Sequence, residues 1–509
     1  MKYEVRDHRW ILFTIDLSIV FLAGLLSFAF YHGVSGLLLG FGSICLTLCE
    51  FLVFYSIGFI IWHTYDSFNR SYSNWDFLYT IGGVITGGVL CSVCMYCGLS
   101  GTVFSSHDLI LQMIFSIIGI RAVRHLILIH YQFYGRRSEN NGYYGLSDIA
   151  LLNVELSEFL PRSPIHIDIE NINREISGKV VLVTGGAGSI GSALVKKIAT
   201  YNPSLLIIVD QAETPLHQLG IELRRDFPSL SFKSVLTDVA NATVMQHVFE
   251  CHRPSVVFHA AAYKHVSMME ENPVECVLNN VRSTVMLVDM AVDSNCRKFV
   301  LVSSDKAVNP SGLMGCSKRI CEIYCQSFNY SDKNNGCAFI TTRFGNVLGS
   351  SGSVVPIFRD QIRRGGPLTL THPDVIRYFM LVEEACDLVL EASVLGVGGE
   401  IFVFDMGKPV KILDLARKMI QISGRKDIKI EYIGLGVGEK LFEEILADKE
   451  HITSTVNEKI WIAKVTAPDF EIVSEKIKKL ILAAENNDAV SVKTLMHEIV
   501  PEFAERNNR

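Results

Sequence analysis

Long apolar segments dominate the first 130 residues of the chain. They cover residues 11–31, 37–62, 77–98 and 108–129, and two arginines interrupt the last of them. An α-helix needs roughly 20 apolar residues to cross a hydrocarbon layer of about 30 Å. The pattern therefore predicts a four-helix membrane anchor over residues 1–130, with a re-entrant or interfacial helix as the alternative for the fourth segment.

Basic residues are distributed unevenly around these segments. The loops near residues 32–36 and 99–107 carry no lysine or arginine. The other ends carry Lys2, Arg6, Arg9, Arg70, Arg121, Arg124, Arg136 and Arg137. Because short basic loops stay on the cytoplasmic side, we expect a multi-pass protein of the inner, cytoplasmic membrane with its following domain in the cytoplasm. No A-x-A-like site follows the first segment, so we expect that segment to be retained.

Two acidic residues lie inside the apolar segments. Asp16 and Glu50 would be costly in a membrane without a partner. Arg121 or Arg124 could supply one. Structural pairing or placement at the lipid interface explains these acids better than a transport pathway, because no internal repeat or pair of broken helices accompanies them.

Small residues in the third segment predict close helix packing. Gly83 and Gly87 have the spacing that lets two membrane helices approach each other. Cys91, Cys94 and Cys97 follow at three-residue spacing without a fourth ligand. We interpret them as polarizable packing residues and expect no metal site.

The pattern of apolar positions changes after a polar connection at residues 131–177. Fully apolar strands that alternate with helices are typical of a parallel sheet covered on both faces. The short apolar runs that show this alternation lie at residues 180–183, 205–209, 256–259 and 299–302. We therefore predict a doubly wound α/β domain over residues 178–509, with a smaller substrate-binding part toward the C-terminus.

Composition narrows the functional class. With 509 residues, 49% of them hydrophobic, the chain is too long and too apolar for one soluble domain. Its thirteen cysteines lack a disulfide pattern in the second part, which fits reduced thiols in a cytosolic compartment. The net charge of −6 and the lack of a basic, aromatic-rich patch argue against nucleic acid as a partner.

A glycine-rich turn follows the first predicted strand of the second part. The run Thr184-Gly-Gly-Ala-Gly-Ser-Ile-Gly191 precedes a predicted helix. Such glycines let the backbone approach a pyrophosphate, whose charge then faces the helix N-terminus. Asp210 ends the next strand, where its carboxylate can hold ribose hydroxyls and would repel the 2′-phosphate of NADP. The pattern predicts an NAD site made by Gly185, Gly188, Ser189, Ile190, Gly191 and Asp210.

A second motif carries the candidate chemistry. The run Ser303-Ser-Asp-Lys-Ala-Val-Asn-Pro310 is followed by Met314-Gly-Cys-Ser-Lys318. The spacing of Met314 and Lys318 resembles the Tyr-x-x-x-Lys pair of short-chain dehydrogenases and reductases, but a methionine cannot exchange a proton. Either the chain is inactive, or Asp305 and Lys306 are its acid and base.

Further motifs extend this resemblance over residues 179–446. They are His259-Ala-Ala-Ala-Tyr-Lys-His-Val266, Asn272-Pro-Val-Glu275, Asn279-Asn-Val281, Arg343-Phe-Gly-Asn-Val-Leu-Gly-Ser350, Gly352-Ser-Val-Val-Pro356, Thr371-His-Pro373, Arg377-Tyr-Phe-Met380 and Gly438-Glu-Lys440. The chain resembles the membrane-anchored UDP-N-acetylglucosamine 4,6-dehydratases of the polysaccharide biosynthesis protein family, which are extended short-chain dehydrogenases. The resemblance implies NAD as cofactor, a UDP-sugar as substrate and a 4-keto-6-deoxy product for a surface glycan.

The resemblance also implies catalytic roles. Ser304 would hydrogen-bond the sugar near O4, Asp305 would be the acid and Lys306 the base. Lys318 would bind the nicotinamide ribose, and Met314 marks the position of the missing tyrosine. Because a base must be neutral, we expect burial, Lys318 and the cofactor charge to lower the pKa of Lys306. We expect the pKa of Asp305 to be raised.

Binding roles follow from the same resemblance. Asp238 and Val239 would meet the adenine, and Ala260 and Ala261 would lie beside the cofactor. The candidates for binding the hexose and the diphosphate are Lys264, His265, Asn346 and Arg377.

Some positions depart from the relatives. Gly436 and Val437 replace the arginine and proline of their Arg-Pro-Gly-Glu-Lys run, which would remove a nucleotide or diphosphate contact. Ser283 replaces a usual glycine. The connection at residues 131–177 is too short for the extra nucleotide-binding-like domain of longer relatives, so we expect a short form.

Other interpretations stay open at this point. Inversion at C5 during dehydration leaves no sequence signal, whereas a sugar-nucleotide epimerase would normally keep the tyrosine. A non-catalytic membrane scaffold that binds NAD or a nucleotide sugar would need none of the proton chemistry. The lipid bilayer is an expected partner, and the sequence leaves open a homo-oligomer and contact with membrane glycosyltransferases.

Overall fold

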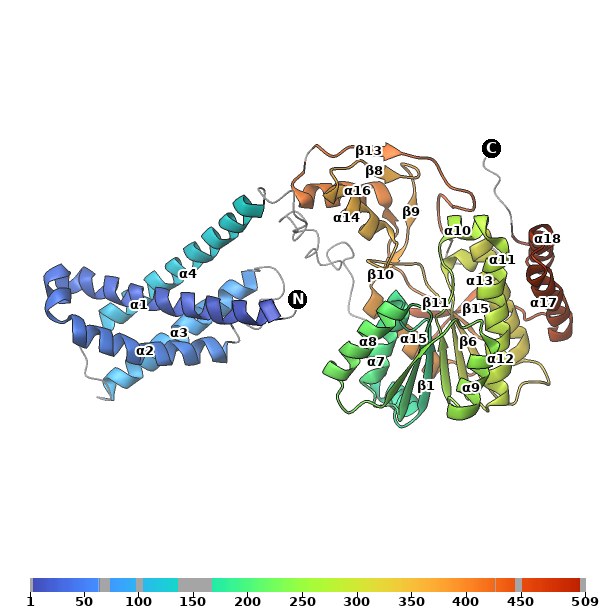
Figure 1. Cartoon of the computed structure of the whole chain (residues 1–509), viewed down its shortest axis with the longest axis horizontal. Coiled ribbons are helices and arrows are strands. Elements are labelled where there is room, and N and C mark those ends of the chain that lie inside the picture. Colours follow the sequence, from blue (N-terminus) through green and yellow to red (C-terminus); the bar gives the residue numbers. More distant parts are fainter. Residues whose placement is uncertain are drawn as a thin grey trace. The chain divides into compact units, whose positions relative to one another are not determined.

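The computed structural model describes residues 3–62, 64, 74–97, 104–135, 167–425, 427–444 and 451–503. The chain divides into two compact units, Met1–Val154 and Glu155–Arg509 (Figure 1). Lys2, Arg70, Arg136 and Arg137, which the sequence assigns to the basic flanks of the anchor, lie outside the described residues.

Four long helices contain nearly all the described residues of the first unit. They are α1 (Tyr3–Leu39), α2 (Phe41–Ile61), α3 (Asn74–Tyr96) and α4 (Ser106–Gly135). Each contains a stretch long and apolar enough to cross a membrane, at Phe13–Leu38, Phe41–Ile61, Leu78–Tyr96 and Ser106–Arg124. The prediction of four apolar helices is confirmed. The loop expected at residues 32–36 is instead a kink in α1 at Gly33, where φ is 71°.

Helices α2 and α3 pack closely through glycines. A Cβ atom on Gly58 would collide with the carbonyl oxygen of Gly83, and one on Gly87 would lie 2.8 Å from the Cα atom of Tyr55. Tyr55 and Phe59 are fully buried beside these positions. The predicted close-packing role of Gly83 and Gly87 is confirmed, with Gly58 as their partner on the facing helix.

A buried ion pair joins two helices of the first unit. Asp16 of α1 forms an ion pair with Arg124 of α4, and the Arg124 Nη1 atom lies 3.3 Å from the Thr80 hydroxyl. Arg124 is 4% exposed, so it lies in the interior of the helical unit and not in a flanking loop. The expected partner of Asp16 is therefore found, whereas Glu50 lies on the exposed side of α2.

A nine-stranded sheet organises the second unit. Its order is β14-β15-β11-β6-β5-β4-β1-β2-β3. All neighbours from β3 to β11 are parallel, and only β15 and β14 are antiparallel additions. The strands are β1 (Val180–Thr184), β2 (Leu205–Asp210), β3 (Phe232–Leu236), β4 (Val256–His259), β5 (Lys298–Val302), β6 (Ala338–Arg343), β11 (Ile401–Phe404), β14 (His451–Ser454) and β15 (Ile460–Lys464). The predicted doubly wound sheet is confirmed, with the strand order of a Rossmann fold at its centre.

Helices cover both faces of this sheet (Figure 1). One core joins the sheet to α9 (Ala242–His252), α12 (Ser283–Asp293), α13 (Leu313–Asn329), α17 (Phe470–Glu485) and α18 (Ala489–Ile499). The other joins it to α6 (Ile169–Ile176), α7 (Ser189–Ala199), α8 (Glu213–Asp226) and α15 (Val382–Leu395). Because Ile172 and Ile176 of α6 are fully buried, part of the predicted polar connection belongs to the folded second unit. The predicted helix after Gly191 in fact begins at Ser189.

A smaller part lies above the carboxyl ends of the parallel strands in Figure 1. It is built from short strand pairs and two helices. These are β7 (Asn346–Val347) with β10 (Phe379–Met380), β8 (Leu368–Leu370) with β13 (Ile430–Tyr432), β9 (Ile376–Arg377) with β12 (Val410–Lys411), α14 (Val354–Arg363) and α16 (Ile412–Ser423). Connections from the sheet add α10 (Val266–Glu271), α11 (Pro273–Cys276), the π-helix η2 (Val277–Arg282) and the 3₁₀ turn η3 (Asp305–Ala307).

Candidate active site

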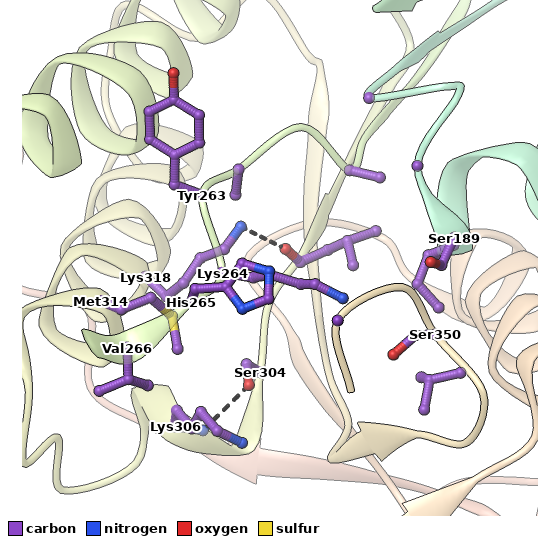
Figure 2. A pocket seen from close by; sticks show the side chains of 18 of the residues that line it. Ser189, Tyr263, Lys264, His265, Val266, Ser304, Lys306, Met314, Lys318 and Ser350 are labelled. Atoms are coloured by element: carbon purple, nitrogen blue, oxygen red, sulfur yellow. Dashed lines mark hydrogen bonds between the residues drawn. The ribbon is translucent and has the colours of Figure 1, made fainter. Parts of the chain in front are cut away.

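A cavity of about 820 Å³ opens at the carboxyl ends of the central strands (Figure 2). In doubly wound sheets this edge is where ligands bind. Its walls are formed by the glycine turn, the ends of β4 and β5, helix α13 and the region around β7. Among the predicted site residues the cavity brings together Gly185, Gly188, Ser189, Ile190, Gly191, Ala260, Lys264, His265, Ser304, Lys306, Met314, Lys318 and Asn346.

The glycine turn leaves no room for a side chain at Gly185 or Gly191. Gly185 has a φ of 65°, and a Cβ atom there would lie 2.6 Å from the backbone nitrogen of Ala261. A Cβ atom on Gly191 would collide with the Gly185 carbonyl. Gly188 precedes α7 without a side-chain cap, so the first N–H groups of this helix face the cavity edge. This cradle fits a dinucleotide pyrophosphate.

The two acidic residues predicted to bind the cofactor accept hydrogen bonds from nearby backbone N–H groups. The Asp210 carboxylate accepts hydrogen bonds from the N–H groups of Ala187 and Ala212, both at 2.9 Å. Asp238 accepts one from Ala240 N–H at 2.8 Å. These two acids and Val239, which is 5% exposed, are not among the residues that line the cavity in the described part of the chain. Asp210 nevertheless ties the second strand to the glycine turn.

The candidate acid and base lie on one short turn after β5. The Ser304 hydroxyl accepts a hydrogen bond from Lys306 N–H at 3.3 Å and donates to Asp305 Oδ1 at 2.9 Å. The Lys306 Nζ atom donates to Asp305 Oδ1 at 3.1 Å and to Asn346 Oδ1 at 3.2 Å. It also lies 3.3 Å from Glu443 Oε1. The ammonium therefore has three oxygen partners.

The charges around this turn confirm one expected pKa shift and overturn another. Burial raises the pKa of Asp305, as expected, and Glu443 adds to the effect. Burial by itself would lower the pKa of Lys306, but the carboxylates of Asp305 and Glu443 more than offset it, so the pKa of Lys306 is raised. The expectation of a lowered pKa for Lys306 is wrong, because it took account of nearby cations and of no second carboxylate.

Glu443 is the site residue that the sequence did not reveal. Its side chain is 3% exposed, and it contacts both Lys306 and Arg377. The only sequence signal is its position just after the Gly438-Glu-Lys440 motif. Glu444 follows directly and is 49% exposed at its side chain, so sequence spacing does not tell which of the two acids points inward.

Helix α13 supplies the opposite wall of the cavity. Met314 and Lys318 are one turn apart and share a face of this helix (Figure 2). Met314 is 2% exposed, so a thioether lines the cavity at the predicted position of the phenol. The Lys318 Nζ atom donates to the Val302 carbonyl at 2.9 Å, and burial lowers the pKa of this lysine.

Polar groups on the third side come from the β4 and β7 ends. The Lys264 Nζ atom donates to the Ser351 carbonyl at 2.8 Å. Burial lowers the pKa values of Lys264 and His265, and in His265 the charge of Lys264 adds to the shift. The buried Nδ2 atom of Asn346 has no hydrogen-bond partner among the described residues. Amide and ammonium donors of this kind can hold sugar hydroxyls or phosphate oxygens.

Arg377 lines a second, smaller cavity of about 240 Å³. Its guanidinium donates to the carbonyls of Ile376, Leu441 and Lys440 at 2.7 to 3.2 Å. These contacts hold the 439–443 segment against β9. Lys306 and His265 border both cavities, and Gly436 and Val437 line the smaller one.

The comparisons with known proteins agree with this geometry. Residues 181–465, more than half of the chain, match the family described as "Polysaccharide biosynthesis protein". The chain belongs to this family.

Individual proteins are similar to more than half of this chain. Capsular polysaccharide biosynthesis protein CapD of Staphylococcus aureus is 45% identical over 318 residues, which are 62% of this chain and 53% of that protein. The chain thus spans about half the length of this relative. An uncharacterized membrane protein of Methanocaldococcus jannaschii is 41% identical over 289 residues, or 56% of this chain and 84% of that protein. The X-ray structure of Pen from Bacillus thuringiensis covers 58% of this chain and 91% of its own, with 31% identity and a TM-score of 0.54.

Proposed function

We propose that the chain is a membrane-anchored, NAD-dependent 4,6-dehydratase of a UDP-N-acetylhexosamine, with UDP-N-acetylglucosamine as substrate. The observation that supports this most is the short turn after β5, where Lys306 lines the cavity and Asp305 is buried beside it. Asp305 and Lys306 lie together on one turn, and Met314 stands one helical turn before Lys318. This arrangement supplies an acid and a base for the sugar without a phenol.

Each residue then has one task. Bound NAD+ supplies the hydride acceptor for C4 and later the hydride donor for C6 of the sugar. As hydride leaves C4, the O4 hydroxyl proton passes through the Ser304 hydroxyl to the Asp305 carboxylate. Once C4 is a ketone the C5 proton is acidic, and Lys306 removes it. Asp305 gives its proton to the C6 oxygen, which leaves as water, and Lys306 returns a proton to C5. Ser304 hydrogen-bonds the sugar near O4, and Lys318 holds the nicotinamide ribose.

The proposed cofactor is NAD rather than NADP. Gly185, Gly188 and Gly191, with the first turn of α7, would hold the pyrophosphate. Asp210 would repel a 2′-phosphate, and Gln211 and Ala212 after it carry no positive charge. Asp238, Val239, Ala260 and Ala261 remain the proposed neighbours of the adenosine and nicotinamide groups.

The proposed substrate contacts differ from the sequence expectation at one residue. Lys264, His265 and Asn346 border the main cavity and would bind the hexose and diphosphate. The guanidinium of Arg377 donates hydrogen bonds to backbone carbonyls and forms an ion pair with Glu443. We therefore assign Arg377 to the 439–443 segment and not to the diphosphate.

The anchor gives the proposed enzyme a place in the cell. Four helices that could cross a membrane and the charge bias of the loops support a multi-pass protein of the cytoplasmic membrane with its catalytic unit in the cytoplasm. The product would then be released near membrane glycosyl-phosphate transferases that build a surface glycan.

Mass spectrometry of the reaction in D2O tests the proposal. The purified full chain with NAD+ and UDP-N-acetylglucosamine should yield a product that has lost one water and carries one deuterium at C5. Coupling constants of this product report whether C5 is inverted. Lys306→Ala should slow the reaction by roughly 10²-fold or more while NAD binding is kept.

Three other outcomes would contradict the proposal. An isomer of the substrate without loss of water would indicate an epimerase. Reaction of a different nucleotide sugar alone would overturn the proposed substrate and would implicate Gly436 and Val437. Normal glycan synthesis in cells that carry only Lys306→Ala would favour a non-catalytic scaffold.

A further inference from the structure

A buried carboxylate joins the candidate base to the smaller cavity. Glu443 Oε1 lies 3.3 Å from Lys306 Nζ and 3.5 Å from Arg377 Nε. The other oxygen, Oε2, is buried and has no hydrogen-bond partner among the described residues. A carboxylate in such a place is costly unless it is paired. Its position between two cations therefore needs an explanation beyond packing.

The partners of Lys306 suit a charged amine. An ammonium has three N–H donors, and Lys306 Nζ has three oxygen partners, on Asp305, Asn346 and Glu443. The base of the proposed reaction, however, must be a neutral amine. Asp305 needs its own proton for the C6 oxygen. Glu443 is the remaining carboxylate within reach of Nζ.

We propose, on the basis of the function proposed above, that Glu443 is the positioning residue of Lys306, which holds Nζ beside the cavity and fixes the pH at which the amine becomes neutral and can act on C5. The contact of Glu443 Oε1 with Nζ stabilises the ammonium, so the neutral amine forms at higher pH than it would beside Asp305 alone. The neutral amine then takes the C5 proton and gives a proton back to C5.

The cations around Glu443 keep its carboxylate ionised. Burial would raise its pKa, but Lys306, Arg377 and Lys440 together keep it below the usual range. Arg377 is itself paired with Glu439 at 3.3 Å, and Lys440 with Glu444 at 3.1 Å. His265 borders both cavities, and the pKa of its ring is lowered, which favours the neutral form. Asp305 is the second acid that faces Lys306.

Competitive acetylation of Lys306 at graded pH measures its protonation without any turnover. The Lys306 side chain is 22% exposed at the cavity, and the labelled peptide is quantified by mass spectrometry. In the full chain, Glu443→Gln should move the midpoint of Lys306 labelling to lower pH by about one unit or more, because an opposite charge in contact is removed. Glu444→Gln removes the same charge from the next residue and should leave the midpoint where it is.

A second variant keeps the test decisive if Glu443→Gln does not fold. Glu443→Asp retains the charge on a shorter side chain, so its midpoint should stay above that of Glu443→Gln and near the wild-type value. An unchanged midpoint in Glu443→Gln overturns the proposal. A Glu443→Asp midpoint that lies about one pH unit or more below the wild-type midpoint also overturns it.

The pH dependence of C5 deuterium exchange adds the catalytic readout. Glu443 raises the pKa values of both Lys306 and Asp305. In Glu443→Gln both limbs of the bell-shaped profile should therefore move to lower pH, whereas a merely structural defect would lower the rate and leave the limbs in place. Exchange that is absent in the wild type counts against the dehydratase and not against the labelling result.

Discussion

Charged residues in the second unit are buried where opposite charges surround them. Glu322 of α13 has a fully buried side chain and accepts hydrogen bonds from Arg343 at 2.7 and 2.8 Å and from Ser303 at 2.7 Å. Arg319 lies 3.1 Å away. Burial alone would raise the pKa of Glu322, but Arg343 and its other partners outweigh burial and lower it. This cluster connects α13, which carries Met314 and Lys318, to β6.

Glu322→Gln should destabilise the protein by roughly 3–5 kcal/mol at neutral pH, because it removes the buried carboxylate that Arg343 and Arg319 share. A carboxylate with a lowered pKa stabilises the fold above the ordinary carboxyl pKa of about 4.3, and this stabilisation is lost as the pH falls through the lowered value. The difference in stability between wild type and variant should therefore become smaller as the pH falls. Thermal unfolding in detergent between pH 7 and pH 3 measures it.

Glu475→Gln is the matched control for this experiment. Glu475 forms an exposed ion pair with Lys479 one helical turn away, and solvent screens such pairs. The melting temperature should not change. A Glu322→Gln variant that melts like this control at neutral pH would show that the buried cluster does not stabilise the fold.

Single residues were predictable where a local motif fixes their position. The glycine turn, Ser304, Lys306, Met314 and Lys318 meet in one cavity as their spacing implied. The charge state of Lys306 was not predictable in this way, because Glu443 reaches it from a distant segment. Local sequence reports which groups are neighbours along the chain, whereas a pKa depends on every charge that the fold brings close.

At the scale of elements, helix contacts in the first unit depend on the absence of side chains. Gly58 of α2 faces Gly83 and Gly87 of α3 so closely that a Cβ atom would meet backbone atoms. Backbone cannot move aside as a flexible side chain can. The contact between α2 and α3 therefore tolerates no larger residue at this position.

Gly58→Ala should weaken the packing of α2 on α3 by about 1–3 kcal/mol, the usual cost of an overpacked core. Gly42→Ala is the control in the same helix, because a Cβ atom at Gly42 meets nothing within 4 Å. Thermal aggregation of the detergent-solubilised full chain should begin at lower temperature only for Gly58→Ala. Equal curves for the two variants would refute a structural role for this contact.

The apolar runs that the sequence analysis named match strands almost to the residue, whereas β6 and β11 were not predicted. The run expected at residues 256–259 is strand β4, and the run at 299–302 differs from β5 by one residue. Helix α6 was not predicted, because its sequence is mostly polar and only Ile172 and Ile176 enter the core. An eight-residue helix with two core contacts is fixed by the fold around it rather than by its own pattern.

At the scale of the whole molecule, each unit closes its own core. Among the described residues, the apolar clusters of the second unit draw only on residues after 166, and that of the first unit only on residues before 121. The family match likewise lies entirely within the second unit. The residues that line the main cavity also belong to the second unit, so we expect this cavity to form without the first unit.

A chain that begins at Glu155 should fold without the anchor, because compact units with their own core usually fold alone. We expect it in the soluble fraction, with NAD affinity and dehydration rate in solution within about twofold of the full chain. In a deletion strain the same chain should fail to restore full glycan synthesis, since its product is no longer released beside the membrane transferases. Full restoration at matched expression would refute the delivery role of the anchor. A shortened chain that aggregates or loses NAD binding would show instead that the second unit depends on the first.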